Sequence, residues 1–218
     1  MKFTYADYIK WDDNTRYELI HGVAYAMAAP TRLHQKISGE IFRQLANFLR
    51  GKPCEVYSAP FEVRLNAESY DDIVVQPDLF VVCDDSKHDG KSLIGAPDLI
   101  IEILSPKNTK NDTFVKYLLY QKAGVREYWI VDPFRRTVEV YTLKSGKYGK
   151  GTIYRDDDII PVHTLKGCQI NAADVFYNII ESDLDEYMLI PQYKIIQILK
   201  ANGMNAKQIE KILDELNN

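Results

Sequence analysis

Apolar residues recur along the chain with helical spacing in some segments and strand-like spacing in others. The apolar positions between residues 31 and 50 are three or four residues apart, which predicts an amphipathic helix ending before Gly51. A second helix is expected to begin at Asn111 or Asp112 and to end at Gly124. The apolar side of the first comprises Leu33, Ile37, Ile41, Leu45, Phe48 and Leu49, and the second contains Phe114, Val115, Leu118 and Leu119.

Shorter apolar segments predict strands around these helices. Residues 16–27 are typical of two strands joined by a turn at His21-Gly22. Residues 73–82 and 99–104 are nearly continuous apolar runs, as expected of strands covered on both faces. Further strands are expected at 55–65, 127–131 and 137–143, a polar loop at 84–95, and irregular strands and turns at 144–176.

The order of helix, strands, helix and strands predicts an α/β domain with a mixed central sheet flanked by helices. We expect this domain to occupy residues 1–180. Residues 181–218 are predicted to form a C-terminal helical extension, a hairpin of helices at 184–201 and 206–216.

Composition narrows the class of protein. The chain has 218 residues, a net charge of −4, and 15 tyrosines, so a disordered chain or a globally basic nucleic-acid coat is excluded, although a local basic groove is not. It contains no apolar run of about 20 residues and no signal-peptide pattern, which predicts a cytoplasmic protein without a membrane partner. Cys54, Cys83 and Cys168 form no CxxC pair and are expected to be reduced, mostly buried thiols.

Two carboxylates in neighbouring apolar segments are the first candidates for chemistry. Asp78 follows Pro77 in the middle of one predicted strand, and Glu102 lies within the next. A carboxylate in an apolar strand is costly unless it is paired or binds a cation, and two together suit Mg²⁺. The alternative is that each is satisfied by backbone N–H groups or an arginine. Asp98 is about 13 Å along the strand from Glu102 and is expected to be structural.

Lys116 is the second candidate, in the helix that follows the Glu102 strand. On a helical wheel Lys116 flanks the apolar stripe of that helix. This position does not show whether its side chain points inward or outward. The alternative to a role in the site is an i,i+4 surface pair with Asp112.

Several separated motifs follow one another along the chain. They are Tyr17 to Gly22, His34-Gln35, Pro77-Asp78, Glu102 to Pro106, Asp112 to Lys116 with Tyr120, and Gly124 to Pro133. Together and in this order, they resemble the Uma family of candidate restriction endonucleases within the PD-(D/E)XK nuclease superfamily. The resemblance covers roughly residues 5–176. Two positions depart from the usual patterns: Leu104 stands where the superfamily has a lysine, and His21 where the family usually has an acidic residue.

The resemblance implies a restriction-endonuclease-like fold and a metal-dependent endonuclease acting on nucleic acid, with DNA the expected substrate. It implies that Asp78, Glu102 and the Ile103 carbonyl hold one Mg²⁺ or Mn²⁺, which would polarise the scissile phosphate and activate a water. Lys116 would then orient that water or stabilise charge on the phosphate. Glu18 is either a further catalytic acid or a structural carboxylate.

A basic stripe and a histidine on the first helix are candidates for nucleic-acid binding. Arg32, Lys36, Arg43 and Arg50 fall within about 40° on the helical wheel, so they form either a phosphate-tracking ridge or a solvated face. His34 lies on the apolar side, as a core histidine or as an auxiliary group in the cleft.

Other functional classes stay open from sequence. A catalytically inactive protein of the same fold would bind nucleic acid or a protein partner, and the tail could be an interaction hairpin. A homodimer would suit cleavage of both strands of a duplex.

Overall fold

The structure, a computed structural model, describes residues 2–12, 15–105, 110–180 and 182–184, with no side-chain description for residues 110–113. The chain separates into two compact units, residues 1–179 and 180–218. The hairpin expected at 184–216 lies almost wholly outside the described residues. None of the described helices combines the length and apolar character needed to span a membrane.

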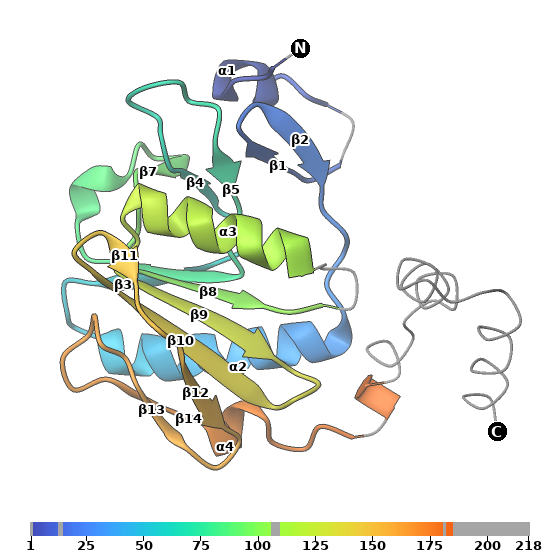
Figure 1. Cartoon of the computed structure of the whole chain (residues 1–218), viewed down its shortest axis with the longest axis vertical. Helices are drawn as coiled ribbons and strands as arrows, with labels where there is room; N and C mark the ends of the chain where they lie inside the picture. The colour runs from blue at the N-terminus through green and yellow to red at the C-terminus, as the bar shows by residue number, and fades with distance from the viewer. Residues whose placement is uncertain (1, 13–14, 106–109, 181, 185–218) are drawn as a thin grey trace, which may run out of the picture. The chain divides into compact units, whose positions relative to one another are not determined.

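The larger sheet has seven strands and forms the centre of the first unit (Figure 1). Its order is β11-β10-β9-β8-β6-β3, with β12 pairing with β10. β8 and β9 are parallel and the other pairs are antiparallel, so the sheet is mixed as predicted. The strands are β3 (Glu55–Ser58), β6 (Leu79–Val82), β8 (Leu99–Ile103), β9 (Glu127–Asp132), β10 (Thr137–Lys144), β11 (Lys147–Tyr148) and β12 (Thr152–Arg155).

A second, five-stranded sheet has the order β2-β1-β5-β4-β7. The expected turn joins its first hairpin, where His21 and Gly22 have φ values of 50° and 78°. A Cβ on Gly22 would also come within 2.8 Å of the Lys2 side chain. The strands of this sheet are β1 (Tyr17–Ile20), β2 (Val23–Ala26), β4 (Glu62–Arg64), β5 (Val74–Val75) and β7 (Ser92–Ile94). The other short elements described are α1 (Tyr5–Tyr8), η1 (Asp85–Lys87), the paired strands β13 (Ile159–Pro161) and β14 (Gln169–Asn171), and α4 (Ala172–Val175).

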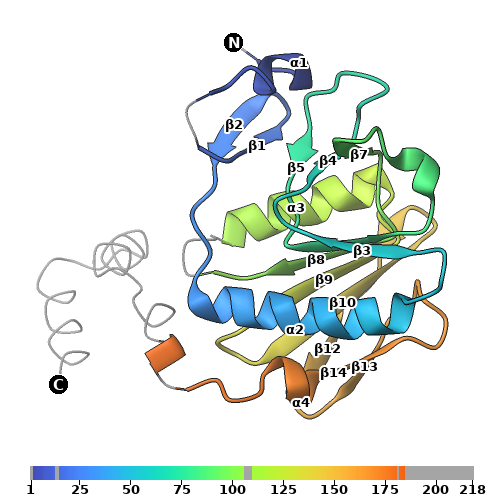
Figure 2. The same cartoon turned by 180° about the vertical axis from the view of Figure 1, so that it is seen from behind.

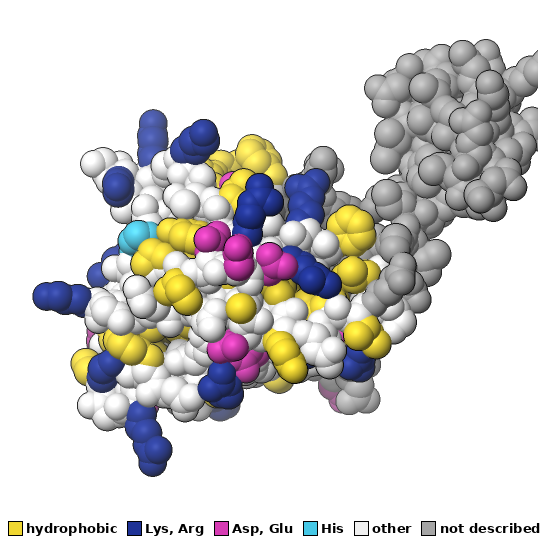
Figure 3. All heavy atoms as spheres, turned by 90° about the horizontal axis from the view of Figure 1, so that it is seen from below, with side chains coloured by type: hydrophobic (Ala, Val, Ile, Leu, Met, Phe, Trp, Pro, Cys, Tyr) yellow, Lys and Arg dark blue, Asp and Glu magenta, His cyan; other side chains and the backbone are white. Residues whose placement is uncertain are grey.

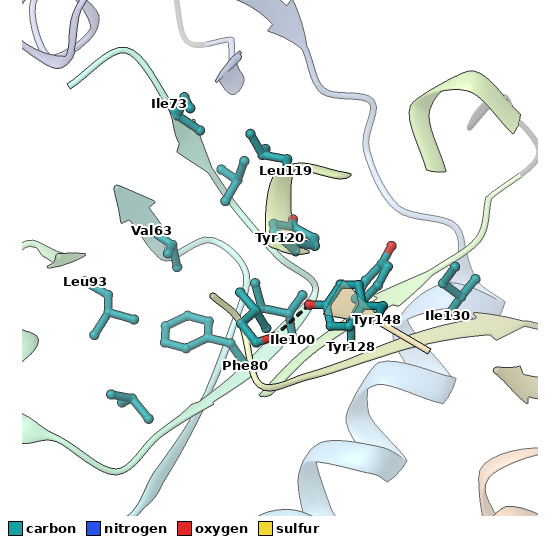
Figure 4. Packing of buried hydrophobic residues seen from close by; sticks show 13 residues of the cluster. Val63, Ile73, Phe80, Leu93, Ile100, Leu119, Tyr120, Tyr128, Ile130 and Tyr148 are labelled. Atoms are coloured by element: carbon teal, nitrogen blue, oxygen red, sulfur yellow. Dashed lines mark hydrogen bonds between the residues drawn. The ribbon is translucent and has the colours of Figure 1, made fainter. Parts of the chain in front are cut away.

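Two long helices, α2 (Arg32–Leu49) and α3 (Lys110–Ala123), lie on opposite faces of the larger sheet (Figures 1 and 2). Both agree with the predicted helices within two residues. Because side chains alternate along a strand, Ile100 and Glu102 of β8 both face α3. The α3 side of the sheet carries an apolar core around Phe80, Ile100, Leu119, Tyr120, Tyr128 and Tyr148 (Figure 4).

Three predicted segments were assigned wrongly. Residues 55–65 and 73–82 are not single strands: each divides into one strand of the larger and one of the smaller sheet. Ala59-Pro60 separates β3 from β4, and Gln76-Pro77-Asp78 separates β5 from β6. Proline lacks an N–H for the ladder, so each break falls at a proline. Residues 84–95 contain η1 and β7 rather than only a loop.

The apolar side of α3 also differs from the prediction. Phe114, Val115 and Leu118 are 62%, 43% and 44% exposed, whereas Leu119 and Tyr120 are buried. α3 therefore packs on the sheet through a face that also carries polar side chains, and its inward surface could not be identified from hydrophobicity alone.

Cys54 and Cys83 form a disulfide, which corrects the expectation of three reduced thiols. They precede β3 and follow β6, and the pairing of Glu55 with Val82 places them opposite each other. Twenty-nine residues separate them in sequence, so no local motif indicated the bond. Cys168 is a free, buried thiol, and burial raises its pKa to about 11.

Removing this disulfide is expected to destabilise the protein. For a 29-residue separation, loop-closure entropy predicts a loss of about 3–4 kcal/mol in the free energy of unfolding. Denaturant unfolding of the Cys54→Ser/Cys83→Ser variant, with and without reductant, measures it. Reductant should destabilise the wild type and leave the variant unchanged; three titratable thiols in the unfolded, unreduced wild type would contradict the bond.

Candidate active site

The predicted carboxylates meet where β6 begins and β8 ends. The antiparallel register pairs Leu79 with Ile101, so one further step places Asp78 opposite Glu102. Asp78 Oδ2 accepts a hydrogen bond from the Ile103 backbone N–H at 2.7 Å. Asp78 lies between Pro77 and the start of β6. Its backbone carbonyl still accepts from the Ala59 N–H at 3.1 Å, while its side chain reaches the end of β8.

Lys116 points inward and bridges two carboxylates. Its Nζ lies 2.9 Å from Glu18 Oε1 and 3.0 Å from Glu102 Oε1, and its side chain is only 16% exposed. Although burial lowers the pKa of Lys116, Glu102 and Glu18 raise it well above its usual value. Lys116 is therefore a fixed cation inside the acidic group, and the surface-pair alternative is wrong.

Glu102 is held from α3 by two donors one helical turn apart. Its Oε1 accepts from Lys116 Nζ and, at 2.6 Å, from the hydroxyl of Tyr120. Burial raises the pKa of Glu102 to about 7; Asp78 and Glu18 raise it as well, while Lys116 and Tyr120 lower it. The charged form of Glu102 thus depends on the Lys116 ammonium and the Tyr120 hydroxyl beside it.

Glu18 enters the group from the other sheet. Leu19 pairs with Val74 across β1 and β5, which brings Glu18 to the β5–β6 break. Glu18 Oε1 accepts from the Gln76 backbone N–H at 3.1 Å as well as from Lys116. Glu18 therefore fixes the Lys116 ammonium and joins the two sheets at the site.

His34 approaches Asp78 from α2. Thr31 caps this helix by accepting from the His34 N–H, and His34 Nε2 lies 3.0 Å from Asp78 Oδ2. Burial is the largest single influence on the pKa of His34 and lowers it. The hydrogen bond with Asp78 and the negative charges of Asp78 and Glu102 together outweigh burial, so the net change is upward. Within the described residues its buried Nδ1 has no hydrogen-bond partner. His34 is thus a buried histidine that contacts Asp78 and lines a cavity of about 170 Å³ with it.

The basic stripe of α2 does not join this group as a set. Lys36 Nζ donates to the Asn178 carbonyl, and Arg43 pairs with Glu40, while Arg32 is exposed at the helix start. On the face drawn in Figure 3, Lys and Arg side chains lie dispersed among acidic and apolar ones. Asp98 is structural as expected, because it accepts from the Cys83 N–H and pairs with Arg126.

Two residues that build the site were given no role from the sequence. Tyr120, which belongs to one of the family motifs, holds Glu102, and its i+4 spacing from Lys116 was the available signal for this role. The Gln76 side chain accepts from Arg16 and donates to the Tyr8 hydroxyl, a contact that no local pattern indicates.

The donor set of the site fits a hard divalent cation. The hydrogen bonds described for the two carboxylates use Asp78 Oδ2 and Glu102 Oε1, which leaves Asp78 Oδ1 and Glu102 Oε2 as ligand atoms. Two carboxylate oxygens and a strand-end carbonyl suit Mg²⁺, which keeps several waters. Elsewhere in the described part, the ligand atoms of Glu55, Asp85 and His88 lie within 4.8 Å of one another, but Glu55 and Asp85 are exposed.

A mixed sheet between two helices, with an Asp-Glu-Lys group at the strand ends, defines a protein of the nuclease-fold class. Comparison with known proteins gives the family. Residues 5–173 match the family model "Uma2: Putative restriction endonuclease", and the chain belongs to this family.

Two further proteins are similar to this chain. An uncharacterized protein of Synechocystis sp., slr1290, is 26% identical over 144 residues, covering 64% of this chain and 74% of that protein. A crystal structure from Anabaena variabilis, titled as a putative nuclease belonging to DUF820, matches with a TM-score of 0.65 and 21% identity. It covers 80% of this chain and 97% of that one. At this identity, the structural match establishes the fold.

Proposed function

We propose that this protein is a Mg²⁺- or Mn²⁺-dependent endonuclease that hydrolyses phosphodiester bonds of nucleic acid, with DNA as its substrate. The observation that carries the proposal is the convergence of Asp78, Glu102 and Lys116 at one end of the larger sheet. Its membership of the Uma2 family supports the nuclease reading.

The chain's own residues have distinct roles in this proposal. Asp78, Glu102 and the Ile103 carbonyl would hold the cation, which when bound supplies a Lewis acid for the phosphate and lowers the pKa of its water. Lys116 stays protonated beside Glu102 and would orient the attacking water or stabilise charge on the phosphate.

The remaining site residues position these groups. Glu18 holds the Lys116 ammonium, and Tyr120 fixes the Glu102 carboxylate. His34 holds Asp78 from the α2 side, where it would also lie near the substrate backbone. Arg32, Lys36 and Arg43 would contact phosphates along α2, which requires Lys36 and Arg43 to exchange their present partners for the backbone.

A direct experiment tests the proposal. Purified protein is incubated with supercoiled DNA and with RNA in Mg²⁺, Mn²⁺ or EDTA, and nicked products are counted. We expect nicking of DNA with either metal, none in EDTA, and none from Asp78→Ala. A wild-type protein that cuts none of a varied set of DNA and RNA substrates would refute the enzymatic proposal.

One observation favours a second candidate, a binding module without catalysis. Lys116 bridges Glu102 and Glu18, so one cation already offsets part of their negative charge without a divalent cation. Calorimetric titration with Mn²⁺ separates the two. Binding that Asp78→Ala and Glu102→Gln each remove favours the nuclease, and its absence favours the binding module.

His34 gives a further prediction for the same site. Truncating a residue that orients a metal ligand costs about 10–100-fold in metal affinity or activity. His34→Ala should therefore weaken Mn²⁺ binding and slow nicking by such a factor while the fold is kept. Asn47→Ala, at an exposed position on the same helix, is the matched control. Unchanged Mn²⁺ affinity in His34→Ala would make His34 a packing residue only.

The cellular setting belongs to the proposal as well. We place the protein in the cytoplasm with its nucleic-acid substrate and propose that it acts there as a homodimer, which would suit cleavage of both strands where a duplex is locally opened. Fractionation of intact cells tests this location. The Cys54–Cys83 disulfide is an observation against it, because disulfides are rare in reducing compartments. Light scattering of the purified protein tests the dimer.

A further inference from the structure

A cavity that contains neither Asp78 nor Glu102 lies between α1 and the smaller sheet. Its volume is about 480 Å³, within the range of small-molecule sites. In Figures 1 and 2, α1 lies beside the β1–β2 hairpin, near the ends of β4 and β5. The residues that line this cavity include Tyr5, Tyr8, Trp11, Tyr17, Glu62 and Lys91.

Aromatic rings form the walls of this cavity. Trp11 contacts the rings of Tyr8 and Tyr17 at centroid distances of 5.3 and 5.2 Å and interplanar angles of 58° and 75°. It meets Phe3 at 89°, so none of these three contacts is a parallel stack. A planar heterocycle would stack parallel to the Trp11 ring, and none of these three rings occupies that position.

The walls are held rigidly before any ligand arrives. The Tyr8 hydroxyl donates to the Tyr17 carbonyl at 3.1 Å and accepts from Gln76 Nε2 at 3.0 Å. Tyr5 donates to Glu62, and the Arg64 guanidinium covers the Tyr5 ring at 4.1 Å. A preorganised aromatic site loses little conformational entropy on binding.

The polar groups of the cavity match the edge and the backbone of a nucleotide. The Glu62 carboxylate can accept a hydrogen bond from an N–H group on the Watson–Crick edge of a base, such as N3–H of thymine. Lys91 is exposed and can pair with a phosphate. Aromatic walls with one acceptor and one cation suit a nucleobase attached to a phosphodiester chain better than an apolar ligand.

The cavity is linked to the candidate active site through one residue. Gln76 lines the cavity, and its backbone N–H donates to Glu18, which binds Lys116. Gln76 is also two residues before Asp78. A nucleotide in this cavity would therefore belong to the strand whose phosphate lies at the carboxylates.

We propose that this cavity binds an unpaired nucleobase of the nucleic acid, flanking the phosphate at the Asp78–Glu102 site, and so makes the protein prefer single-stranded or locally opened substrate. The position of the scissile phosphate in this statement rests on the proposed function, whereas the base-binding cavity does not. Bases bind aromatic side chains by stacking with little dependence on sequence.

Trp11 provides the means to test it. The chain has two tryptophans, and Trp129 is fully buried, so quenching by an added base reports on Trp11. The titrations use the full-length Glu102→Gln variant in EDTA, with oligo(dT), a duplex of equal length, and the mononucleotide dTMP. Oligo(dT) is expected to quench the fluorescence and to bind more tightly than the duplex or dTMP.

Variants of the cavity separate its contribution from general binding. Trp11→Ala should weaken oligo(dT) binding, measured by anisotropy, about 10- to 100-fold. Lys91→Ala, at an exposed position that does not endanger folding, should reduce the slope of log K against log salt by about 0.7. Tyr70→Ala removes an aromatic ring that is 80% exposed outside the cavity and should change neither quantity.

Each outcome decides one of the two proposals. Quenching by oligo(dT) with weakened binding in Trp11→Ala supports the cavity, even if the wild type cuts no nucleic acid and the nuclease proposal fails. Absent quenching, or Trp11→Ala and Lys91→Ala both binding as the parent protein does, overturns the cavity proposal even if nicking occurs. If dTMP or the duplex binds as tightly as oligo(dT), the cavity proposal is also overturned.

Discussion

Replacing Glu102 with glutamine is expected to lower the rate of metal-dependent nicking about 1000-fold. The amide keeps the size of the side chain and can still accept the Tyr120 hydroxyl, so the fold is retained. It removes one of the two anionic ligands proposed for the metal ion. The electrostatic stabilisation lost at such a site is worth several kcal/mol, and each tenfold change in rate corresponds to about 1.4 kcal/mol.

Nicking rates and thermal unfolding with and without Mn²⁺ measure this effect. Mn²⁺ should raise the melting temperature of the wild type and leave that of Glu102→Gln unchanged, because only binding to the native state stabilises it. Glu68→Gln, an exposed change of the same kind, is the control. A Glu102→Gln protein that nicks within a factor of three of the wild type would remove Glu102 from the mechanism.

Replacing Lys116 with methionine is expected to cost about 3–5 kcal/mol of unfolding free energy, because it leaves two buried carboxylates without their cation. Methionine preserves most of the apolar stem, so the loss reports on charge rather than packing. Denaturant unfolding in EDTA measures it, and Lys122→Met, at an exposed position on the same helix, should change little.

Two additions sharpen the Lys116 experiment. Mn²⁺ should restore part of the lost stability, since a divalent cation can take over the neutralisation of Glu102. The Lys116→Met/Glu102→Gln double variant should be less destabilised than the sum of the single variants, because the residues are in direct contact. A Lys116→Met protein within about 0.5 kcal/mol of the wild type would contradict a buried ion pair.

Much of the fold could be predicted because its signals are local. The helical period of residues 31–50 and the His21-Gly22 turn depend on nearby positions, and both match the structure. The division at Pro77 was also visible in the sequence, since proline cannot donate to a ladder. A continuous apolar run outweighed that signal, and Asp78 was placed within a strand rather than before one.

The candidate site was predictable as a set of residues but not as an arrangement. The acidic residues and Lys116 were identified by motif order, whereas hydrophobicity gave Lys116 no orientation. Its inward direction depends on Glu18, which lies 98 residues earlier and on the other sheet. Glu18 itself was equally compatible with a structural or a catalytic role, because its partners come from remote segments.

The sequence by itself determined the helices and strands with a clear local period, the mixed α/β class and the candidate site residues. It could do so because residue spacing and side-chain type are local properties. Only the tertiary structure decided which strands belong to which sheet, that Cys54 and Cys83 meet, and that Lys116 faces the carboxylates. It also decided that the aromatic residues of the N-terminal segment enclose a cavity beside Gln76. These features depend on contacts between segments far apart in the chain, and local periodicity carries no information about such contacts.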